Sequence, residues 1–224
     1  MFVDFGQVRA VISNIWGSAY MKKSGSSGFY KFCFWLSRIF INLFFWVSAT
    51  GRENIPEGAT LVCGNHSGQI DPFLLAYVFG INTPIHVISK AELFRIPVIS
   101  QVLTKLEMIS LDRGTLDTNA IKKTFAYLSK GEKVVIFPEG TRTPGDKEAA
   151  AKGGAIKIAE HTKAPILPVY IPRKKRYFSS VKIVIGEPFY VEKQGAKRSQ
   201  AEYAEMAEAL MDTISALRPS KPSK

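Results

Sequence analysis

Cysteine and histidine are scarce in this chain, and the scarcity excludes several kinds of site. The two cysteines, Cys33 and Cys63, are too few for a disulfide framework or a zinc cluster. We therefore expect free thiols in a reducing compartment. The three histidines, His66, His86 and His161, show no metal-ligand spacing, so neither a metal nor a bound cofactor is expected.

The signatures of two common enzyme classes and of a secretion signal are also missing. No serine lies in a G-x-S-x-G motif, which argues against a covalent serine nucleophile. The pair Gly153-Gly154 lacks the spacing of a phosphate-binding P-loop. The N-terminus is not a signal peptide, because Asp4 stands where positive charge is expected and no apolar run leads to a cleavage site.

Acidic residues are outnumbered by basic ones. The 30 Lys and Arg residues against 19 Asp and Glu residues give a formal net charge of +11. This indicates an anionic partner, for which nucleic acid, anionic lipid and a phosphorylated small molecule are the candidates. With 224 residues, 46% of them hydrophobic, the chain suits one large domain or a domain with an appendage.

Two helical patterns occupy the N-terminal part of the chain. Apolar residues recur at helical spacing over residues 5–19, which predicts an amphipathic helix. A second helix is predicted over residues 29–49, with a wide aromatic face and a narrow polar stripe of Lys31, Arg38 and Asn42. It could be a core helix, a membrane span or a helix lying in the lipid interface. Because Arg38 interrupts the apolar run, we favour the interface.

The pattern divides the chain into three parts. Residues 1–50 are expected to bind a membrane, peripherally or monotopically, at its cytoplasmic face. Residues 51–192 alternate β-branched runs with helical stretches, which predicts an α/β domain with a mixed, mostly parallel sheet flanked by helices. Residues 193–224 are predicted to form a helix and a frayed tail, and Ser199 with Glu202 makes a capping box. The strands are expected at 60–63, 85–89, 108–111, 134–137, 166–171 and 181–185, and the domain's helices at 71–78, 92–104, 117–129 and 154–162.

A histidine and an aspartate flank the turn that follows the first of these strands. Asp71, five residues after His66, begins a predicted helix, so the two side chains can meet across one turn. The carboxylate would fix the tautomer of the imidazole, and the other ring nitrogen could then accept a proton near pH 7. The alternative is an aspartate helix cap beside a surface histidine.

A second constellation follows the most apolar predicted strand. The stretch from Phe137 to Arg142 presents a carboxylate, a glycine and a guanidinium at the edge where open α/β sheets bind ligands. The planar fork of Arg142 suits a phosphate group. The alternative is a tight turn with a local Glu–Arg pair. A His–Asp pair without a protein nucleophile suggests that the nucleophile is a hydroxyl group of the substrate.

These motifs resemble those of the glycerolipid acyltransferases, specifically the 1-acyl-glycerol-3-phosphate (lysophosphatidic acid) acyltransferases. The resemblance covers roughly residues 50–190. Its four blocks are Asn65, His66 and Asp71 of an N-H-x-x-x-x-D motif, Ile109-Ser110-Leu111-Asp112-Arg113, Phe137-Pro138-Glu139-Gly140-Thr141-Arg142, and Pro165-Ile166-Leu167-Pro168-Val169.

The resemblance implies a reaction and its residues. A fatty acyl group would pass from acyl-CoA or acyl-carrier protein to the free hydroxyl of 1-acyl-glycerol-3-phosphate, without an acyl-enzyme, and give phosphatidic acid for phospholipid biosynthesis. His66 and Asp71 would be the catalytic pair. The acyl thioester would be a co-substrate, and membrane lipid, rather than nucleic acid, the further partner. The implied substrate-binding residues are Asn65, Arg113, Glu139, Gly140, Thr141 and Arg142.

Two other functions remain open from the sequence. One is acyl transfer to another lysolipid or to an amino-acid-based lipid. The other is a non-enzymatic basic protein that binds membranes or nucleic acid, although it leaves both motifs unexplained. The basic run 173–176 suits a solvated loop, a contact with anionic headgroups or a contact with an acidic carrier protein.

Overall fold

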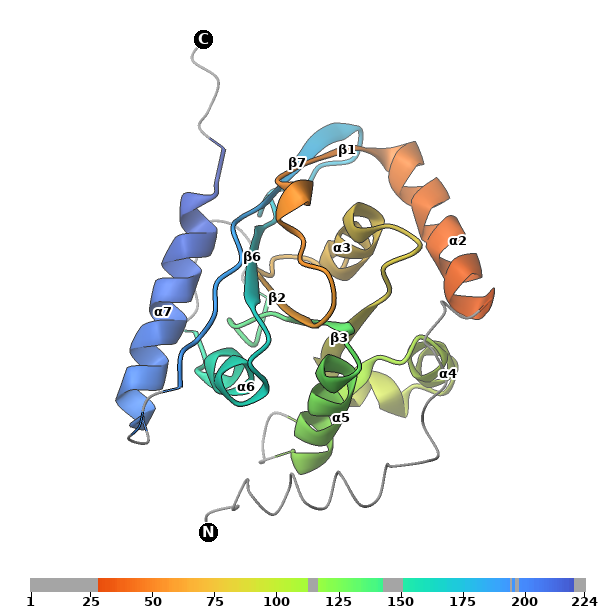
Figure 1. The fold of residues 1–224 in the computed structure, drawn as a ribbon. Coiled ribbons are helices and arrows are strands. Elements are labelled where there is room, and N and C mark those ends of the chain that lie inside the picture. Colours follow the sequence, from red (N-terminus) through yellow and green to blue (C-terminus); the bar gives the residue numbers. More distant parts are fainter. Residues whose placement is uncertain (1–27, 113–116, 143–150, 194, 196–197, 220–224) are drawn as a thin grey trace.

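A seven-stranded sheet forms the centre of the protein in a computed structural model that describes residues 28–112, 117–142, 151–193, 195 and 198–219 (Figure 1). The strands are β1 (Phe45–Thr50), β2 (Thr60–Gly64), β3 (Ile85–Lys90), β4 (Ile109–Leu111), β5 (Lys133–Ile136), β6 (Ile166–Tyr170) and β7 (Ser179–Ile185). Their order is β1-β7-β6-β2-β5-β3-β4, and all neighbours are parallel except β6 and β7. The predicted mixed, mostly parallel sheet is therefore confirmed.

Helices cover both faces of the sheet. The helical elements are α2 (Gly28–Phe44), α3 (Asp71–Phe79), α4 (Pro97–Lys105), α5 (Thr118–Ser129), α6 (Gly154–Thr162), α7 (Gln200–Ala216) and the short 3-10 helices η1 (Arg52–Asn54) and η2 (Ala91–Arg95). Leu61 and Cys63 of β2 pack into the core shared with α5, α6 and α7, whereas Val62 points into the core shared with α2 and α3. Strand residues that alternate between two buried faces explain why β2 is apolar throughout.

The aromatic segment near the N-terminus is shorter as a helix than we predicted. The prediction of a helix over 29–49 is wrong at its C-terminal end, because α2 stops at Phe44 and Phe45–Thr50 forms β1. β1 pairs in parallel with β7, from Phe45 opposite Ser179 to Thr50 opposite Val184. Helical spacing could not reveal this, since short apolar runs fit a helix or a strand and the partner strand lies far along the chain.

The helix predicted over 92–104 is also divided. The chain forms η2, breaks at Ile96, and resumes as α4 from Pro97. Proline has no backbone N–H and pushes the preceding residue out of the helical region, and Ile96 accordingly has φ −86° and ψ 114°. The other predicted helices and strands are confirmed within a few residues, as is the capping box of Ser199 and Glu202. The helix predicted over 5–19 lies outside the described residues.

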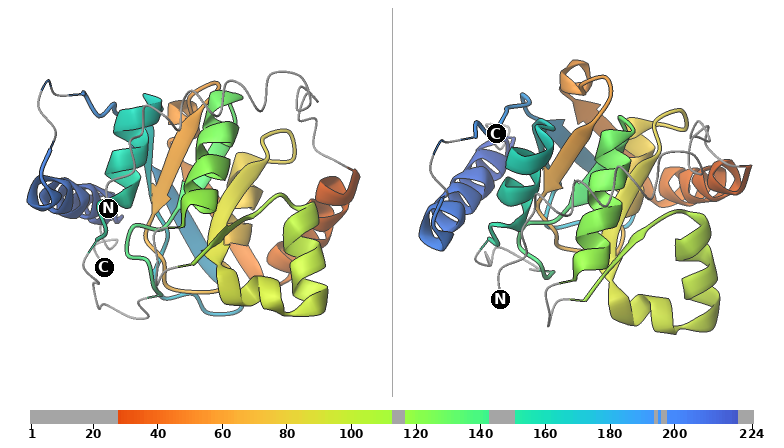
Figure 2. Two further views of the ribbon diagram at one scale, coloured as in Figure 1. Left: turned by 90° about the horizontal axis from the view of Figure 1, so that it is seen from below. Right: turned by 60° about the horizontal axis from the view of Figure 1, so that its bottom comes forward.

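Helix α2 has two different apolar faces. Tyr30, Phe34 and Ile41 are buried against the domain. The opposite face leaves large apolar side chains exposed, among them Trp35 and Ile39 at 54% and 63%. Both views in Figure 2 place α2 beside α4, whose apolar residues are exposed as well. Among the described residues, no helix has the length and apolar character needed to cross a membrane.

Candidate active site

The predicted site residues gather where three neighbouring parallel strands end. β2 leads into Asn65 and His66, β5 leads into the loop of Glu139, and β6, which flanks β2 on its other side, leads into Ile171 and Arg173. The carboxyl ends of parallel strands form the usual ligand-binding edge of an α/β sheet. The topology therefore brings together segments that are more than 100 residues apart.

His66 and Asp71 form the predicted pair. Nδ1 of His66 lies 2.9 Å from Oδ2 of Asp71. The imidazole also stacks on the Phe137 ring, with 4.1 Å between ring centroids. Asp71 is fully buried at the start of α3, where its Oδ2 also accepts hydrogen bonds from the backbone N–H groups of Ser67 and Gly68, at 2.8 Å each. The carboxylate thus fixes both the imidazole and the loop that carries it.

A lysine that we had not assigned to the site contacts the same carboxylate. Nζ of Lys175 lies 2.8 Å from Oδ1 of Asp71 and donates hydrogen bonds to Oγ of Ser67 and the carbonyl of Pro172. Burial alone would raise the pKa of Asp71. The hydrogen bond from His66 and the charge and hydrogen bond of Lys175 outweigh burial, so the pKa of Asp71 lies below its ordinary value.

Asn65 fastens the loop that carries His66 to the residue that follows β6. Its Nδ2 donates to the carbonyl of Ile171, and its Oδ1 accepts from the N–H of the same residue, both at 2.7 Å. Asn65 is 1% exposed. Its amide group is therefore engaged by backbone rather than directed at the cavity.

Glu139 fastens the same loop from the other side. Its Oε1 accepts a hydrogen bond from the backbone N–H of His66 at 3.1 Å and one from Nη2 of Arg173 at 3.2 Å. Burial raises the pKa of Glu139, and the bonds from His66 and Arg173 only partly offset this. The ionic partner of this glutamate comes from the segment after β6, far along the chain from its own turn.

Gly140, Thr141 and Arg142 line the open part of the site. Gly140 has φ +64°, in the left-handed region that favours glycine, and its N–H donates to the carbonyl of Phe137. That N–H therefore closes a turn. Thr141 and Arg142 are exposed at the wall of the cavity. Arg113, the other predicted arginine, lies outside the described residues.

The site opens into a large cavity of about 1650 Å³. Apolar side chains from α2 and α4 form part of its wall, including Leu36, Phe40, Ile99 and Val102. The polar part of the lining holds His66 and several basic side chains. A cavity of this size exceeds the usual range of about 300–1,000 Å³ for small ligands and suits a long apolar group with a charged end.

Comparison with known proteins agrees with the family that the sequence motifs resemble. The family model described as "Acyltransferase" matches residues 47–172, more than half of the chain. The chain belongs to the acyltransferase family. This confirms the resemblance predicted from the sequence motifs.

Individual relatives of this acyltransferase cover most of its length. A 1-acyl-sn-glycerol-3-phosphate acyltransferase of Bacillus subtilis is 34% identical over 195 residues, which is 84% of this chain and 96% of the relative. One of Pseudomonas aeruginosa is 29% identical over 84% of this chain and 76% of its own. The crystal structure of the acyltransferase PlsC from Thermotoga maritima matches with a TM-score of 0.63 and 26% identity, over 97% of this chain and 90% of that one.

Four basic residues that were not among the predicted site residues line the acyltransferase cavity: Lys90, Lys152, Arg173 and Lys175. Lys90 ends β3, and Lys152 lies two residues before the start of α6. Arg173 and Lys175 belong to the basic run that we read as a solvated loop or a surface contact. Composition alone could not separate them from their neighbours, because only the path of the chain turns these two side chains inward.

The cysteine nearest to His66 in sequence is not placed to react. Cys63 lies in β2, close to His66 in sequence, but it is completely buried in the core. This burial raises the pKa of its thiol, so a thiolate is disfavoured. The pair of His66 and Asp71 is better suited to activate a hydroxyl group that the substrate brings.

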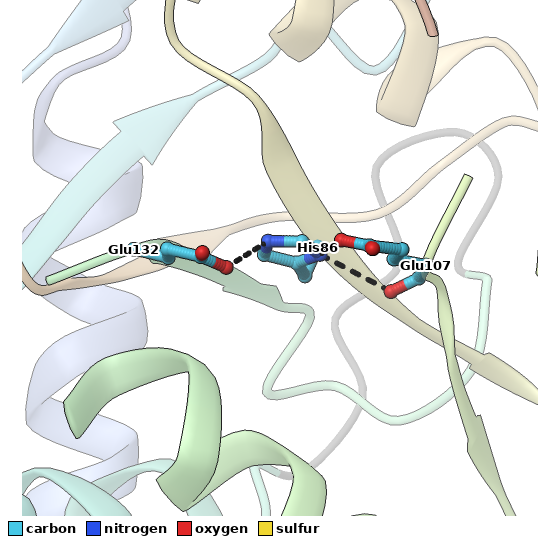
Figure 3. Close-up of side chains that lie close together, drawn as sticks. All are labelled: His86, Glu107 and Glu132. Carbon is cyan, nitrogen blue, oxygen red and sulfur yellow. Dashed lines mark hydrogen bonds and ion pairs between the residues drawn. The ribbon is translucent and has the colours of Figure 1, made fainter. Parts of the chain in front are cut away.

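A second cluster of titratable side chains lies near the N-terminal ends of β3, β4 and β5, whereas the site described above lies at the C-terminal ends of the parallel strands. Figure 3 shows its three residues, His86, Glu107 and Glu132. Nε2 of His86 is 2.6 Å from Oε2 of Glu132, and its Nδ1 is 3.1 Å from the carbonyl of Glu107. The ring stacks on Tyr127 with 3.7 Å between centroids. Because the two glutamates approach different ring nitrogens, one metal ion could not be coordinated by this ring and both carboxylates as they stand. We interpret the cluster as a set of structural contacts that hold the starts of β3, β4 and β5 together.

Proposed function

We propose that this acyltransferase transfers a fatty acyl group from an acyl thioester to the free hydroxyl of 1-acyl-glycerol-3-phosphate and so forms phosphatidic acid. The observation that carries the proposal is the pair of half-buried His66 and fully buried Asp71 at the head of a large apolar cavity with basic residues around it. The names of the relatives support the acceptor.

The geometry supports general-base catalysis. With Nδ1 held by Asp71, Nε2 of His66 takes the proton of the acceptor hydroxyl as its oxygen attacks the thioester carbonyl. The tetrahedral species collapses, the carbon–sulfur bond breaks, and the thiolate leaves with the proton carried by His66. No acyl-enzyme forms, so the acceptor and the donor must be bound together.

The remaining residues divide into two groups in this proposal. Asn65 and Glu139 hold the backbone around His66. Arg142 binds the phosphate of the acceptor, Thr141 and Gly140 shape the wall beside it, and Arg113 is its proposed second arginine. The basic side chains of Lys90 and Lys152 line the same cavity and add positive charge. An arginine fork matches phosphate oxygens in two places, which makes Arg142 the side chain best suited to read this group.

The exposed face of α2 supports a membrane location. We propose that it lies in the lipid interface at the cytoplasmic face and opens the cavity toward the acyl chains of the bilayer. The donor is acyl-CoA or acyl-carrier protein, since either presents a thioester.

A radiolabelled transfer assay tests the reaction. Purified protein, labelled acyl-CoA or acyl-carrier protein, and 1-acyl-glycerol-3-phosphate should give labelled phosphatidic acid, and His66→Ala should give almost none. A panel of lysolipids without phosphate and amino-acid-based lipids identifies the acceptor. Faster transfer to one of these than to 1-acyl-glycerol-3-phosphate would refute the proposed acceptor.

Arg142→Ala provides a second test of the acceptor. A charge-assisted contact with phosphate is worth about 1.5–3 kcal/mol, so kcat/KM for the acceptor should fall roughly 10- to 100-fold. The KM for the donor should change little, and the loss should be smaller on an acceptor without phosphate. An equal loss on both acceptors would show that Arg142 holds the loop and does not bind phosphate.

A further inference from the structure

The segment that connects β6 to β7, residues 172–178, has an inward side that holds the active site. Arg173 contacts the carboxylate of Glu139, and Nζ of Lys175 lies 2.8 Å from Oδ1 of Asp71. Both cations are largely buried, with side-chain exposures of 11% and 7%. The two inward side chains therefore contact the two carboxylates, of Glu139 and Asp71, that hold the loop of His66 in place.

The same segment has an outward side of a different character. Lys174 and Arg176 are exposed, and Tyr177 and Phe178 are 66% and 64% exposed. Water-exposed aromatic rings beside basic side chains are typical of surfaces that lie in the interface of an anionic membrane. Inward and outward residues alternate from Arg173 to Arg176, and two exposed aromatic residues follow, so the outer surface and the inner cations belong to one stretch of backbone.

The outward aromatic rings continue the exposed face of α2. The Tyr177 ring lies 5.4 Å from that of Phe44 and 5.6 Å from that of Phe45, and the Phe178 ring lies 5.7 Å from Phe44. The N–H of Phe178 donates to the carbonyl of Phe44 at 2.6 Å. Phe178 also has φ +58°, a conformation that a bulky side chain adopts only when its surroundings hold it. The segment is thus fixed to the helix that we propose for membrane binding.

We propose that the segment 172–178 binds an anionic lipid surface through its outward side chains and thereby holds Lys175 against Asp71. This rests on the proposed function, in which His66 is the base. Lys175 acts as a positioning residue, since it contacts Asp71 and not the reacting atoms. Its charge keeps Asp71 ionised and prevents the carboxylate from rotating away from His66. Lipid contact with the outward side chains would stabilise the segment, and with it the contact between Lys175 and Asp71 that the structure shows.

The surface is tested by vesicle sedimentation with a matched control. The probe is vesicles of 70% phosphatidylcholine and 30% phosphatidylglycerol. The double variant Tyr177→Ser with Phe178→Ser should need about tenfold more lipid for half-binding, because two aromatic rings leave the interface. The control is Tyr190→Ser, which removes a tyrosine that is 67% exposed. Tyr190 lies outside the segment 172–178, next to Phe189, which pairs with Ile166 at the start of β6. This variant should bind vesicles like the parent protein. Equal binding by the double variant and the parent protein would overturn the proposal that this segment binds anionic lipid.

The positioning role is tested through the pH profile. Lys175→Met should lower kcat roughly 10- to 100-fold on a water-soluble short-chain acceptor and move the acid limb of the profile to higher pH, because Asp71 loses its neighbouring charge. Lys175→Arg should recover much of the rate, and neither change should alter vesicle binding. An unchanged acid limb in Lys175→Met would assign Lys175 to folding alone and overturn this part.

The link between the two sides is tested by adding lipid that is not a substrate. The same phosphatidylcholine and phosphatidylglycerol vesicles should raise kcat of the parent protein on the soluble acceptor several-fold, and should not raise it in the double variant. Equal stimulation of both proteins would overturn the link. If the parent protein transfers no acyl group at all, the proposed function fails instead, while sedimentation still decides the surface.

Discussion

At the residue scale, the active site depends on how completely Asp71 is engaged. One carboxylate oxygen faces His66 and two backbone N–H groups, and the other faces Lys175. A buried carboxylate needs such partners, because burial alone disfavours its charged form. Its position and charge in turn determine which nitrogen of His66 carries the proton.

Asp71→Asn should reduce kcat by roughly 10²–10⁴, comparable to the loss of a positioned base. An asparagine can present its amide N–H to His66, which favours the wrong tautomer, and it places no negative charge beside the imidazolium. Steady-state rates with saturating acceptor and donor measure the effect, with thermal unfolding as the control for folding. A variant that keeps more than about a tenth of the parent rate would contradict this role for Asp71.

The lowered pKa of Asp71 also predicts how the free energy of unfolding depends on pH. The pKa of Asp71 in the folded protein lies below its value in the unfolded chain, so its contribution to stability is present above about pH 4. That contribution disappears as the pH falls through the lowered pKa. Between pH 5 and pH 2, the free energy of unfolding of Asp71→Asn should therefore fall less than that of the parent, as denaturant titration would measure. If the free energies of unfolding of the variant and the parent fell in parallel with pH, another carboxylate would account for the loss of stability in acid.

At the element scale, α2 combines a structural face with an exposed one. Ile41 is 1% exposed in the core shared with α3, whereas Trp35 and Ile39 point away from the protein. A water-exposed apolar patch of this extent on one helix is typical of a contact surface. The polar residues of the helix lie between these faces, and Arg38 packs over the rings of Trp35 and Tyr77.

Matched variants separate the two faces. Trp35→Gln with Ile39→Gln should change the free energy of unfolding by at most about 0.5 kcal/mol each and weaken binding to anionic vesicles. Ile41→Ala should cost about 2–5 kcal/mol through its cavity and leave the exposed face intact. Denaturant unfolding and vesicle sedimentation measure both. Strong destabilisation by the first pair would show that this face is part of the core.

At the scale of the whole molecule, residues 28–50 are continuous with the α/β domain. β1 closes one edge of the sheet against β7, and Phe45 and Ile41 belong to the core beneath α3. Gly51 then turns the chain with φ +77°, in a place where a Cβ would lie 2.0 Å from the carbonyl oxygen of Ile185. Helix α2, which we propose for membrane binding, and the sheet therefore share one core.

Two shortened chains should behave differently. A chain that begins at Gly28 keeps α2 and β1 and should bind vesicles more weakly than the full chain, because Arg9, Lys22 and Lys23 are lost. A chain that begins at Gly51 loses β1, and the burial of Ile41 and Phe45 alone is worth about 3–6 kcal/mol. Denaturant unfolding compares the three lengths. Equal stability of the chain from Gly51 would show that β1 is dispensable.

Much of the chemistry was readable in the sequence. The spacing of His66 and Asp71 predicts a pair across one turn, and the phenylalanine-to-arginine loop predicts a second motif at a strand end. Both are local patterns, in which the chain geometry over a few residues decides what can meet. The alternation of strands and helices likewise predicts the sheet, because residue periodicity reflects the face that each element buries.

The partners of these motifs were decided only by the tertiary structure. Asn65 clamps the backbone of Ile171, Glu139 binds Arg173, and Lys175 reaches Asp71, all across about 35 to 105 residues of sequence. Nothing local distinguishes these contacts from a solvated basic loop or a surface turn, since a side chain's direction depends on the strands that flank it. For the same reason the sequence shows only that residues 45–47 continue the apolar run of α2, whereas the pairing with β7 makes Phe45–Thr50 a strand.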